Sequence, residues 1–419
     1  MASWREATLG EICDQVGGII RTGPFGSQLH ESDYSGEGIP VVMPKDIVEG
    51  NIATDGVARV SPKHIDRLSQ HKLEAGDIVY GRRGDIGRQA LIRTEQKGWL
   101  CGTGCLRLSF GESVLDPLFL HYYLRQDDVV SWISNQAVGA TMPNLNTGIL
   151  RTVPVKFPTL PVQRRIAGIL ATYDALIENS QRRIRILEGM ARALYREWFV
   201  HFRFPGHKKH PHVASALGEI PKGWEVKTIA DAFEIFGGGT PSRKENEYWL
   251  DGTIRWFSPS DLTRAGTIFM DDSSDHITEI GLAKSSARLF PARSVMLTSR
   301  ATIGVIAINT HEACTNQGFI TCLPNDRVPL YFLFHWLIEN VPTFQRMASG
   351  ATFKEISRGV FKTIEFLQPS PEIVRHFEKA ATPLAEQALT HQRKIQNLRR
   401  TRDLLLPRLL SGQVELATD

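Results

Sequence analysis

Arg82 and Arg83 stand side by side in a turn that glycines bound on both sides. The guanidinium group presents a planar fork of donors that matches a phosphate group or a guanine edge in the DNA major groove. A solvated surface loop explains the same two residues equally well. Two Gly-Ala-Thr loops carry a second polar feature, because Thr141 and Thr352 could contact a DNA backbone or could simply terminate a strand. The side chains with chemistry to offer are therefore groups that bind nucleic acid, each with a structural alternative.

Motifs for catalysis are missing from the sequence. It contains no Walker-type phosphate loop, no HExxH zinc motif and no Asn-Pro-Pro-aromatic motif of the amino-methyltransferases. The glycines at 237–239 lack a βαβ context and indicate a tight turn rather than a cofactor loop. A solvated linker explains the histidine tract better than a metal site does, and this tract comprises His201, His207, His210 and His212. These observations argue against a self-contained modification enzyme.

The five cysteines are odd in number and have no zinc-finger spacing, which is typical of a cytoplasmic protein. Cys101 and Cys105 are expected to be buried thiols. The N-terminal segment lacks the apolar core of a signal peptide, and no uncharged apolar run reaches the length of about 18 residues that a membrane span needs. We therefore expect a cytoplasmic protein with no membrane partner.

The net charge of +4 is spread unevenly along the 419 residues. Residues 1–155 hold 15 Lys and Arg against 18 Asp and Glu, a net of −3, and residues 220–368 hold 15 against 16, a net of −1. Residues 156–205 hold 9 against 4, a net of +5. A protein that neutralises many phosphates alone would show a stronger basic face in its globular parts.

The segment 139–194 occurs twice, the second time 211 residues further on, at 350–405. Twelve of its 56 positions are identical in the two copies, and no gap is needed. Upstream, the stretch 293–304 corresponds to 76–87, which pairs Arg83 with Arg300 and Gly87 with Gly304. Each copy combines short strands and turns with a following helix, and such a repeated chain is expected to act at two similar places.

Apolar residues between 160 and 200 recur at spacings of three and four, which predicts a long helix with a coiled-coil-like seam. A second such helix is predicted over 371–406, and Pro383 inside it should kink or divide it. If a pseudo-twofold axis relates the two globular parts, the helices should pack antiparallel. The residues expected in this packing are Ile166, Ile169, Tyr173, Leu176, Ile184, Leu187, Leu194, Phe377, Leu384, Ile395, Leu398 and Leu405.

The helical segments carry a specific resemblance to a known family. Residues 158–207, with the stretches QRRIAGIL and LEGMARALYREWF, resemble the first conserved region of the specificity subunit of type I restriction-modification systems. Residues 369–414, ending in LLLPRLLSGQV, resemble the second conserved region. Trp224 and the Gly-Gly-Thr-Pro-Ser turn at 238–242 fit the start of a target-recognition domain. The resemblance covers essentially the whole chain.

The resemblance implies an α+β fold in which two similar mixed α/β target-recognition domains are joined by two long helices. These helices would pack as an antiparallel coiled-coil rod, and the whole would form an internal pseudo-twofold repeat. The implied boundaries are 1–157 for target-recognition domain 1, 158–207 for the central helical region and the start of a linker, 208–368 for target-recognition domain 2, and 369–419 for the C-terminal helical region.

The resemblance also implies a non-catalytic DNA sequence-specificity subunit. Each recognition domain would read one half of a bipartite, asymmetric site in double-stranded DNA, and the rod would set the spacing and dock two methyltransferase subunits. Motor-nuclease subunits would join this complex. S-adenosylmethionine, ATP and Mg would be used by the partners, with no cofactor in this subunit. The alternative is a pseudo-symmetric protein-interaction scaffold that reads no bases.

Candidate DNA-contact residues follow from their positions in the repeat. In the first half they are Lys45, Arg82, Arg83, Thr141 and Asn144. In the second half they are Ser260, Arg300, Thr302, Thr352 and Lys354.

Overall fold

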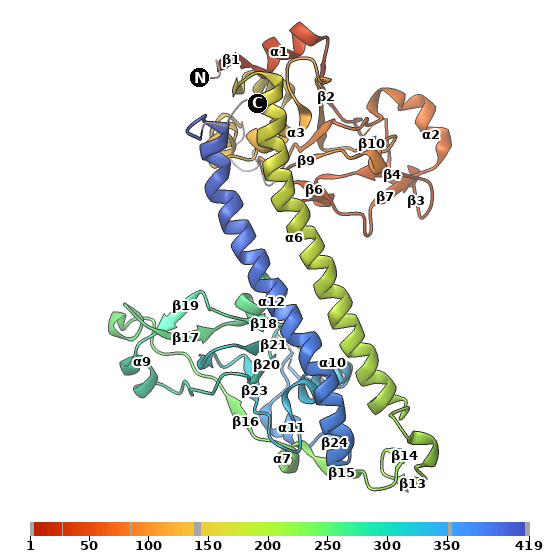
Figure 1. Cartoon of the computed structure of the whole chain (residues 1–419), viewed down its shortest axis with the longest axis vertical. Coiled ribbons are helices and arrows are strands. Elements are labelled where there is room, and N and C mark those ends of the chain that lie inside the picture. Colours follow the sequence, from red (N-terminus) through yellow and green to blue (C-terminus); the bar gives the residue numbers. More distant parts are fainter. Residues whose placement is uncertain (1–3, 27, 84–85, 138–143, 351–353, 415–419) are drawn as a thin grey trace. The chain divides into compact units, whose positions relative to one another are not determined.

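The computed structural model describes residues 4–26, 28–83, 86–137, 144–350 and 354–414. The chain forms two compact units, one made of residues 1–177 with 396–419 and the other of residues 178–395. Each unit combines sheets and short helices with parts of the two longest helices, α6 and α12, as the labels in Figure 1 show. In the described ranges, no helix has the length and apolar character that a membrane span requires.

The first unit contains two four-stranded sheets. One has the antiparallel order β2-β11-β8-β9, and the other has the order β10-β4-β7-β3, in which β10 and β4 are parallel. Its strands are β1 (Arg5–Thr8), β2 (Ile19–Thr22), β3 (Tyr34–Ser35), β4 (Ile39–Val42), β5 (Ile47–Val48), β6 (Asn51–Ile52), β7 (Ala58–Val60), β8 (Ile78–Gly81), β9 (Gln89–Leu91), β10 (Leu100–Cys101), β11 (Cys105–Ser109) and β12 (Pro154–Phe157). Its shorter helices are α1 (Leu9–Val16), α2 (Pro62–Arg67), α3 (Pro117–Tyr123), α4 (Asp127–Gln136) and α5 (Thr147–Arg151), with the 3-10 turns η1 (Glu31–Asp33), η2 (Pro44–Asp46), η3 (Ser69–His71) and η4 (Thr94–Gln96).

The second unit contains a five-stranded sheet in the order β16-β23-β20-β21-β18 and a three-stranded sheet in the order β19-β17-β22. Its strands are β13 (His212–Ser215), β14 (Gly218–Pro221), β15 (Glu225–Thr228), β16 (Ile235–Gly237), β17 (Ile254–Phe257), β18 (Phe269–Met270), β19 (Asp275–Ile277), β20 (Val295–Thr298), β21 (Ile306–Asn309), β22 (Ala313–Thr315), β23 (Phe319–Cys322) and β24 (Glu365–Gln368). Its shorter helices are α7 (Ile229–Ala232), α8 (Pro259–Ala265), α9 (Glu279–Ala283), α10 (Leu330–Met347) and α11 (Arg358–Lys362), with the 3-10 turns η6 (His207–Lys209) and η7 (Asn246–Tyr248).

Local sequence signals explain where helices of the first unit begin. Thr8 and Glu11 form a reciprocal capping box at the start of α1, because each side chain accepts a hydrogen bond from the other residue's backbone N–H. The predicted helix near Pro117 is α3, where Asp116 caps the first turn and Pro117 occupies a position that needs no N–H donor. Cys101 and Cys105 are fully buried, as predicted.

The two units repeat the same backbone contacts. Leu9 donates its N–H to the Val153 carbonyl at 3.0 Å, and Ile229 donates to the Ile364 carbonyl at 3.0 Å. The sheets that precede these contacts correspond as well, since β1 pairs with β12 and β15 pairs with β24, both antiparallel. The internal repeat that the sequence predicts is therefore present at the level of individual hydrogen bonds.

The longest helices run through both units. Helix α6 (Leu160–Tyr195) continues into a π-helical turn, η5 (Arg196–Val200), and α12 spans Pro371–Leu410. In the first unit, Arg402 of α12 donates to Asp174 of α6 at 2.5 Å. Earlier residues of α6, such as Ile166, share a core cluster with later residues of α12, such as Leu410. The two helices are therefore antiparallel within this unit.

The same relation holds in the second unit. The rings of Tyr195 on α6 and Phe377 on α12 are 5.7 Å apart. Burial lowers the pKa of His391 on α12, and the nearby charge of Arg183 on α6 lowers it further. A higher residue number on α6 again corresponds to a lower one on α12. Among the residues predicted to pack between the helices, Leu176 is 40% exposed. The others are buried or half-buried: Ile166, Ile169, Tyr173, Ile184, Leu187, Leu194, Phe377, Leu384, Ile395, Leu398 and Leu405.

Pro383 was predicted to kink or divide α12, and the structure contradicts the division. The helix continues without interruption from Pro371 to Leu410. Pro383 and Lys379, whose carbonyl loses its helical partner, are both exposed. Water can satisfy that carbonyl on the exposed face, while Ala381 and Ala388 bury the opposite face.

Candidate nucleic-acid interface

In the first unit, the candidate arginines lie in the loop that follows β8, and backbone contacts fix them to two other segments. The Arg82 N–H donates to the Gly104 carbonyl at 2.8 Å, and the Leu145 N–H donates to the Arg82 carbonyl at 2.9 Å. Arg83 forms an antiparallel bridge with Asn144. The Arg82 guanidinium donates from Nε to Asn144 Oδ1 at 3.1 Å, so Arg82 orients the Asn144 side chain.

Lys45 belongs to the same group of loops. It lies on η2 and is exposed, and a methyl group added at Gly104 would lie 3.4 Å from the ring of the neighbouring Pro44. The turn is held by Asp46, which accepts a hydrogen bond from the Met43 N–H at 2.9 Å. We call four residues on these adjoining loops the first loop cluster: Lys45, Arg82, Arg83 and Asn144.

The second unit builds the corresponding arrangement after β20. The Ser299 N–H donates to the Gly318 carbonyl at 2.8 Å, and the Ile356 N–H donates to the Ser299 carbonyl at 3.0 Å. Arg300 forms an antiparallel bridge with Glu355. These are the contacts of the first unit, with Ser299 in the place of Arg82. The sequence alignment of Arg83 with Arg300 therefore agrees with the structure.

Ser260, Thr302 and Lys354 lie around Arg300. Ser260 is exposed on α8, whose first residue, Pro259, would lie 3.2 Å from a methyl group added at Gly318. The Ala301 N–H donates to the Lys354 carbonyl at 3.1 Å, and Thr302 is exposed beside it. We call these four residues the second loop cluster: Ser260, Arg300, Thr302 and Lys354.

Ala301 has a φ of +61°, a left-handed conformation that is strained for a residue with a Cβ atom. The strain lies immediately after Arg300, whose side chain is half exposed. Strained backbone of this kind is held in place by surrounding contacts and is common at binding sites. Here the Lys354 carbonyl supplies one such contact through the Ala301 N–H.

The loops concentrate positive charge that the whole domains lack. Residues 81–93 hold four arginines and one aspartate, and residues 354–362 hold two lysines and one arginine against one glutamate. Arg83, Lys354 and Arg358 are all exposed. A local basic surface of this type suits phosphate and guanine, although the domains around it are slightly acidic.

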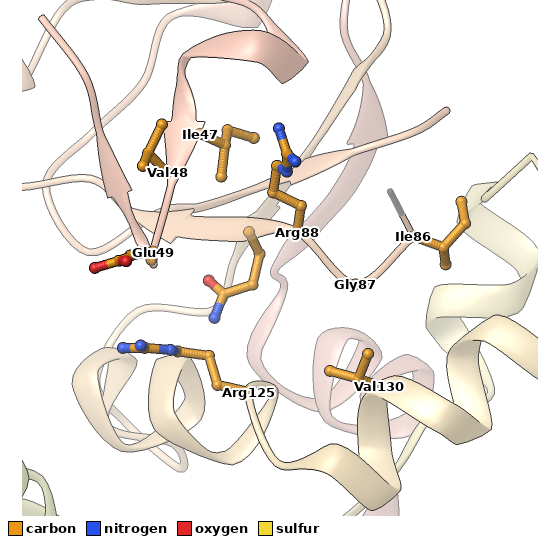
Figure 2. Close-up of a pocket in the computed structure, with 10 residues that line it drawn as sticks. Ile47, Val48, Glu49, Ile86, Gly87, Arg88, Arg125 and Val130 are labelled. Atoms are coloured by element: carbon orange, nitrogen blue, oxygen red, sulfur yellow. The ribbon is translucent and has the colours of Figure 1, made fainter. Parts of the chain in front are cut away.

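Figure 2 shows a cavity of about 450 Å³ in the first unit, between the β5–β6 turn, the residues before β9 and the junction of α3 and α4. Arg88, Arg125 and Glu49 line it, so its charges have both signs. His121 contacts two of the lining residues, through Nδ1 with Gln89 at 3.1 Å and through Nε2 with Arg125 at 3.4 Å. Burial and the charge of Arg125 lower the pKa of His121 to about 3, which keeps the imidazole neutral.

Two candidate residues cannot be placed, because Thr141 and Thr352 lie outside the described residues. Sequence reasoning also missed two residues of the second unit, Glu355 and Arg358. Glu355 could have been found from the repeat, since it corresponds to Asn144 at the offset of 211 residues. Within the described ranges, no group of three His, Cys, Asp or Glu side chains is arranged to hold a metal ion.

Comparison with known proteins places this fold in a family. Residues 1–188 and 221–395 match the type I restriction modification DNA specificity domain. The type I restriction enzyme HindI specificity subunit of Haemophilus influenzae is 22% identical, over 99% of this chain and 100% of the relative. The MjaIX specificity subunit of Methanocaldococcus jannaschii is 24% identical, over 92% and 88% of the two chains.

A solved structure has the same fold. The S subunit of a type I restriction-modification system from M. genitalium superposes with a TM-score of 0.61 at 16% identity, over 99% of this chain and 97% of that one. The family match covers most of the chain and includes both loop clusters. The protein is therefore a member of the type I restriction-modification DNA specificity domain family, and each of its two repeated parts matches that domain.

Proposed function

We propose that each repeated domain reads one half of a bipartite, asymmetric site in double-stranded DNA. The observation that carries this proposal is the duplicated loop arrangement, in which the same three backbone contacts hold Arg83 in one domain and Arg300 in the other. Arginine is suited to guanine and phosphate, and two separate sites on one chain suit two separate half-sites. The residues around the arginines differ, which supports different sequences in the two halves.

The two long helices have a different role in this proposal. They connect the recognition domains, set the distance between the half-sites, and dock two methyltransferase subunits. Exposed apolar side chains on α6, including Ile186 at 54% and Met190 at 52%, leave surface for such docking. Motor-nuclease subunits then join the complex.

The chemistry belongs to the partners. S-adenosylmethionine would be bound by the methyltransferase subunits, and ATP and Mg would be bound by the motor-nuclease subunits. The relatives by name are specificity subunits, and the sequence of this chain carries no motif for binding these cofactors. This subunit would read the bases and set the distance between the two half-sites.

The decisive experiment is to co-express this chain with a type I methyltransferase subunit from the same genome and to map modified adenines in the host DNA. We expect a split motif, with two short specified halves around a fixed unspecified gap. A soluble complex of the two proteins that modifies no such motif would contradict base reading and favour a protein-interaction scaffold.

A domain exchange separates reading from scaffolding. Residues 1–155 would be replaced by the recognition domain of another member of the family, with the helices left intact. We expect one half of the motif to change while the other half and the gap stay the same. Modification with an unchanged motif would support the scaffold instead.

A further inference from the structure

Asn144 and Glu355 occupy the same position in the two repeats. They are 211 residues apart, the offset of the repeat, and each forms the bridge to the arginine of its own domain. The residue that follows each of them donates its N–H to the same loop carbonyl, from Leu145 at 2.9 Å and from Ile356 at 3.0 Å. The backbone at this position is thus the same in both domains, and only the side chain differs.

We propose that this repeat position is a specificity position, at which Asn144 selects adenine in one half-site and Glu355 selects cytosine in the other. The inference rests on the proposed function and assigns a base to one position of each half-site. In the major groove, Asn pairs with the N6 and N7 groups of adenine, and Glu accepts a hydrogen bond from the N4 amino group of cytosine. The two halves would differ at this position because the two side chains differ.

The Glu355 carboxylate can exchange its contact with Arg300 for a contact with a DNA base. Its carboxylate lies 3.8 Å from Arg300 Nε, and the two side chains are 42% and 48% exposed. An ion pair with this exposure contributes little, so replacing Arg300 with a base amino group costs little. Glu355 also lines an open cavity of about 410 Å³ together with Ser299, Gln317 and Arg358.

The positive charges around Glu355 offset its repulsion from DNA. Arg300, Lys354 and Arg358 lie on the same loops and are exposed. An isolated carboxylate facing phosphates would be unfavourable, whereas one carboxylate among three cations leaves the loop positive. The arrangement allows an acidic side chain to approach a base edge while its neighbours hold the backbone.

In the first domain the corresponding side chain is positioned by Arg82, which donates to Asn144 Oδ1 at 3.1 Å. The amide oxygen has a second lone pair, so it can accept from the adenine amino group at the same time. Ser299 takes the place of Arg82 in the second domain, and its side chain has no guanidinium group to donate to the Glu355 carboxylate. The two domains therefore differ here: Arg82 orients Asn144 through a hydrogen bond, whereas Glu355 has only the exposed ion pair with Arg300 beside it.

The test uses the full chain assembled with its methyltransferase partner and carries Glu355→Gln, Glu355→Asn or Asn144→Glu. Modified adenines are mapped for each complex, and bound duplexes are selected from a randomised library. We expect Glu355→Gln to weaken the preference for one G·C pair in the second half-site by about tenfold. Glu355→Asn should shift that position toward adenine, and Asn144→Glu should shift one position of the other half-site toward cytosine.

The matched control is Glu365→Asn, which changes an exposed glutamate on β24 of the same domain. It should leave the whole motif unchanged. A Glu355 variant that keeps the wild-type motif, or that changes the half-site read by the first domain, overturns the inference. If a variant complex no longer modifies DNA, the motif found in the duplexes that it binds from the randomised library is compared with the wild-type motif instead. Failure of the wild-type complex to show a split motif is a separate result, because it rejects the proposed function.

Discussion

At the scale of single residues, the two domains have different side chains at one pair of core positions. Asp77 and Arg107 form an ion pair inside the first domain, with 2.7 Å between Oδ2 and Nε and both residues almost fully buried. The corresponding positions of the second domain, directly before β20 and on β23, hold Ser294 and Thr321. The first domain therefore carries a buried charge pair that the second domain does not need for the same fold.

We predict that Asp77→Ser alone lowers the stability of the first unit by about 3–5 kcal/mol, because it leaves the Arg107 charge buried without its partner. The double variant Asp77→Ser with Arg107→Thr should lose much less, since it removes both charges and copies the second domain. Urea unfolding with pulsed hydrogen exchange and mass spectrometry resolves the peptides of β8 and β11. Equal losses in the single and double variants would contradict this account.

A second prediction concerns His121 and pH. Burial lowers its pKa to about 3, so below the ordinary value of about 6.5 only the unfolded chain takes up the proton. Stability of the first unit is therefore fully present above about pH 6.5 and falls by about 1.4 kcal/mol per pH unit below it. The free energy of unfolding of the wild type should fall between pH 7.5 and 5.5 by about 1.4 kcal/mol more than that of His121→Gln, because one pH unit of this range lies below 6.5. This difference does not depend on how much the substitution destabilises the unit at pH 7.5.

The readout is the urea midpoint of α3 peptides, equilibrated at each pH and pulse-labelled at a single pH. The matched control is His30→Gln, because His30 lies in the same unit and is exposed. The control should keep the wild-type pH dependence. A His121→Gln protein whose stability falls as steeply as the wild type between pH 6.5 and 5.5 would show that another group carries the effect.

At the scale of elements, α12 supplies the cap that α10 lacks. Pro329 precedes α10 without a side-chain cap, and Glu378 of α12 accepts hydrogen bonds from the N–H groups of Tyr331 and Phe332 at 3.0 and 3.2 Å. Burial raises the pKa of Glu378, while these two hydrogen bonds act in the opposite direction. A carboxylate at a helix N-terminus also meets the positive end of the helix dipole. The contact ties the recognition domain to its long helix.

We predict that Glu378→Ala lowers the stability of the second unit by about 1–3 kcal/mol, because two N–H groups lose their acceptor in a buried region. Glu378→Gln should lose less, since the amide oxygen can still accept from one of them. Hydrogen exchange at Tyr331 and Phe332 should rise in the alanine variant before exchange rises in β20. Unchanged protection of these two amides would contradict the capping role.

Sequence patterns predicted the elements unevenly, for physical reasons. The long helices were predictable because apolar residues recur at helical spacing over about ten turns. The strand orders were not, since pairing depends on contacts between distant segments, such as β10 beside β4. The continuity of α12 at Pro383 was missed because proline usually breaks a helix interior. Here Pro383 lies on the exposed face of the helix, where water can satisfy the carbonyl that loses its partner.

The candidate site was predictable to the extent that the repeat defines it. Arg83 and Arg300 were aligned from sequence, and the structure places them in the same backbone setting. Glu355 was missed because an acidic residue looks wrong in a DNA-facing loop, and its place beside Arg300 appears only once the bridge is seen. The repeat alone did not indicate a base at this position, because the reading proposed for Asn144 and Glu355 depends on the backbone bridge that each forms with its arginine.

At the scale of the whole molecule, the duplication gives each recognition domain its own helix segment and its own loop cluster. The gap-free sequence identity between the copies lies in the segments that lead into the long helices and in those helices, where Gly148 matches Gly359 and Gln181 matches Gln392. The surfaces around Asn144 and Glu355 have diverged within that shared frame. A chain organised in this way keeps one backbone geometry while the side chains of its two loop clusters change independently.

The charge distribution leads to the last prediction, which concerns affinity. The recognition parts carry net charges of −3 over 1–155 and −1 over 220–368, so their basic loops can neutralise only a few phosphates. At about 150 mM salt, we expect the isolated chain to bind its own duplex at least about tenfold more weakly than the assembled complex does. The affinity of the isolated chain should also fall less steeply with salt, because fewer counterions are released. Fluorescence anisotropy over a salt series with both preparations measures both quantities. Equal affinities and equal slopes would mean that this subunit provides the whole grip on the DNA backbone, and that its partners add chemistry alone.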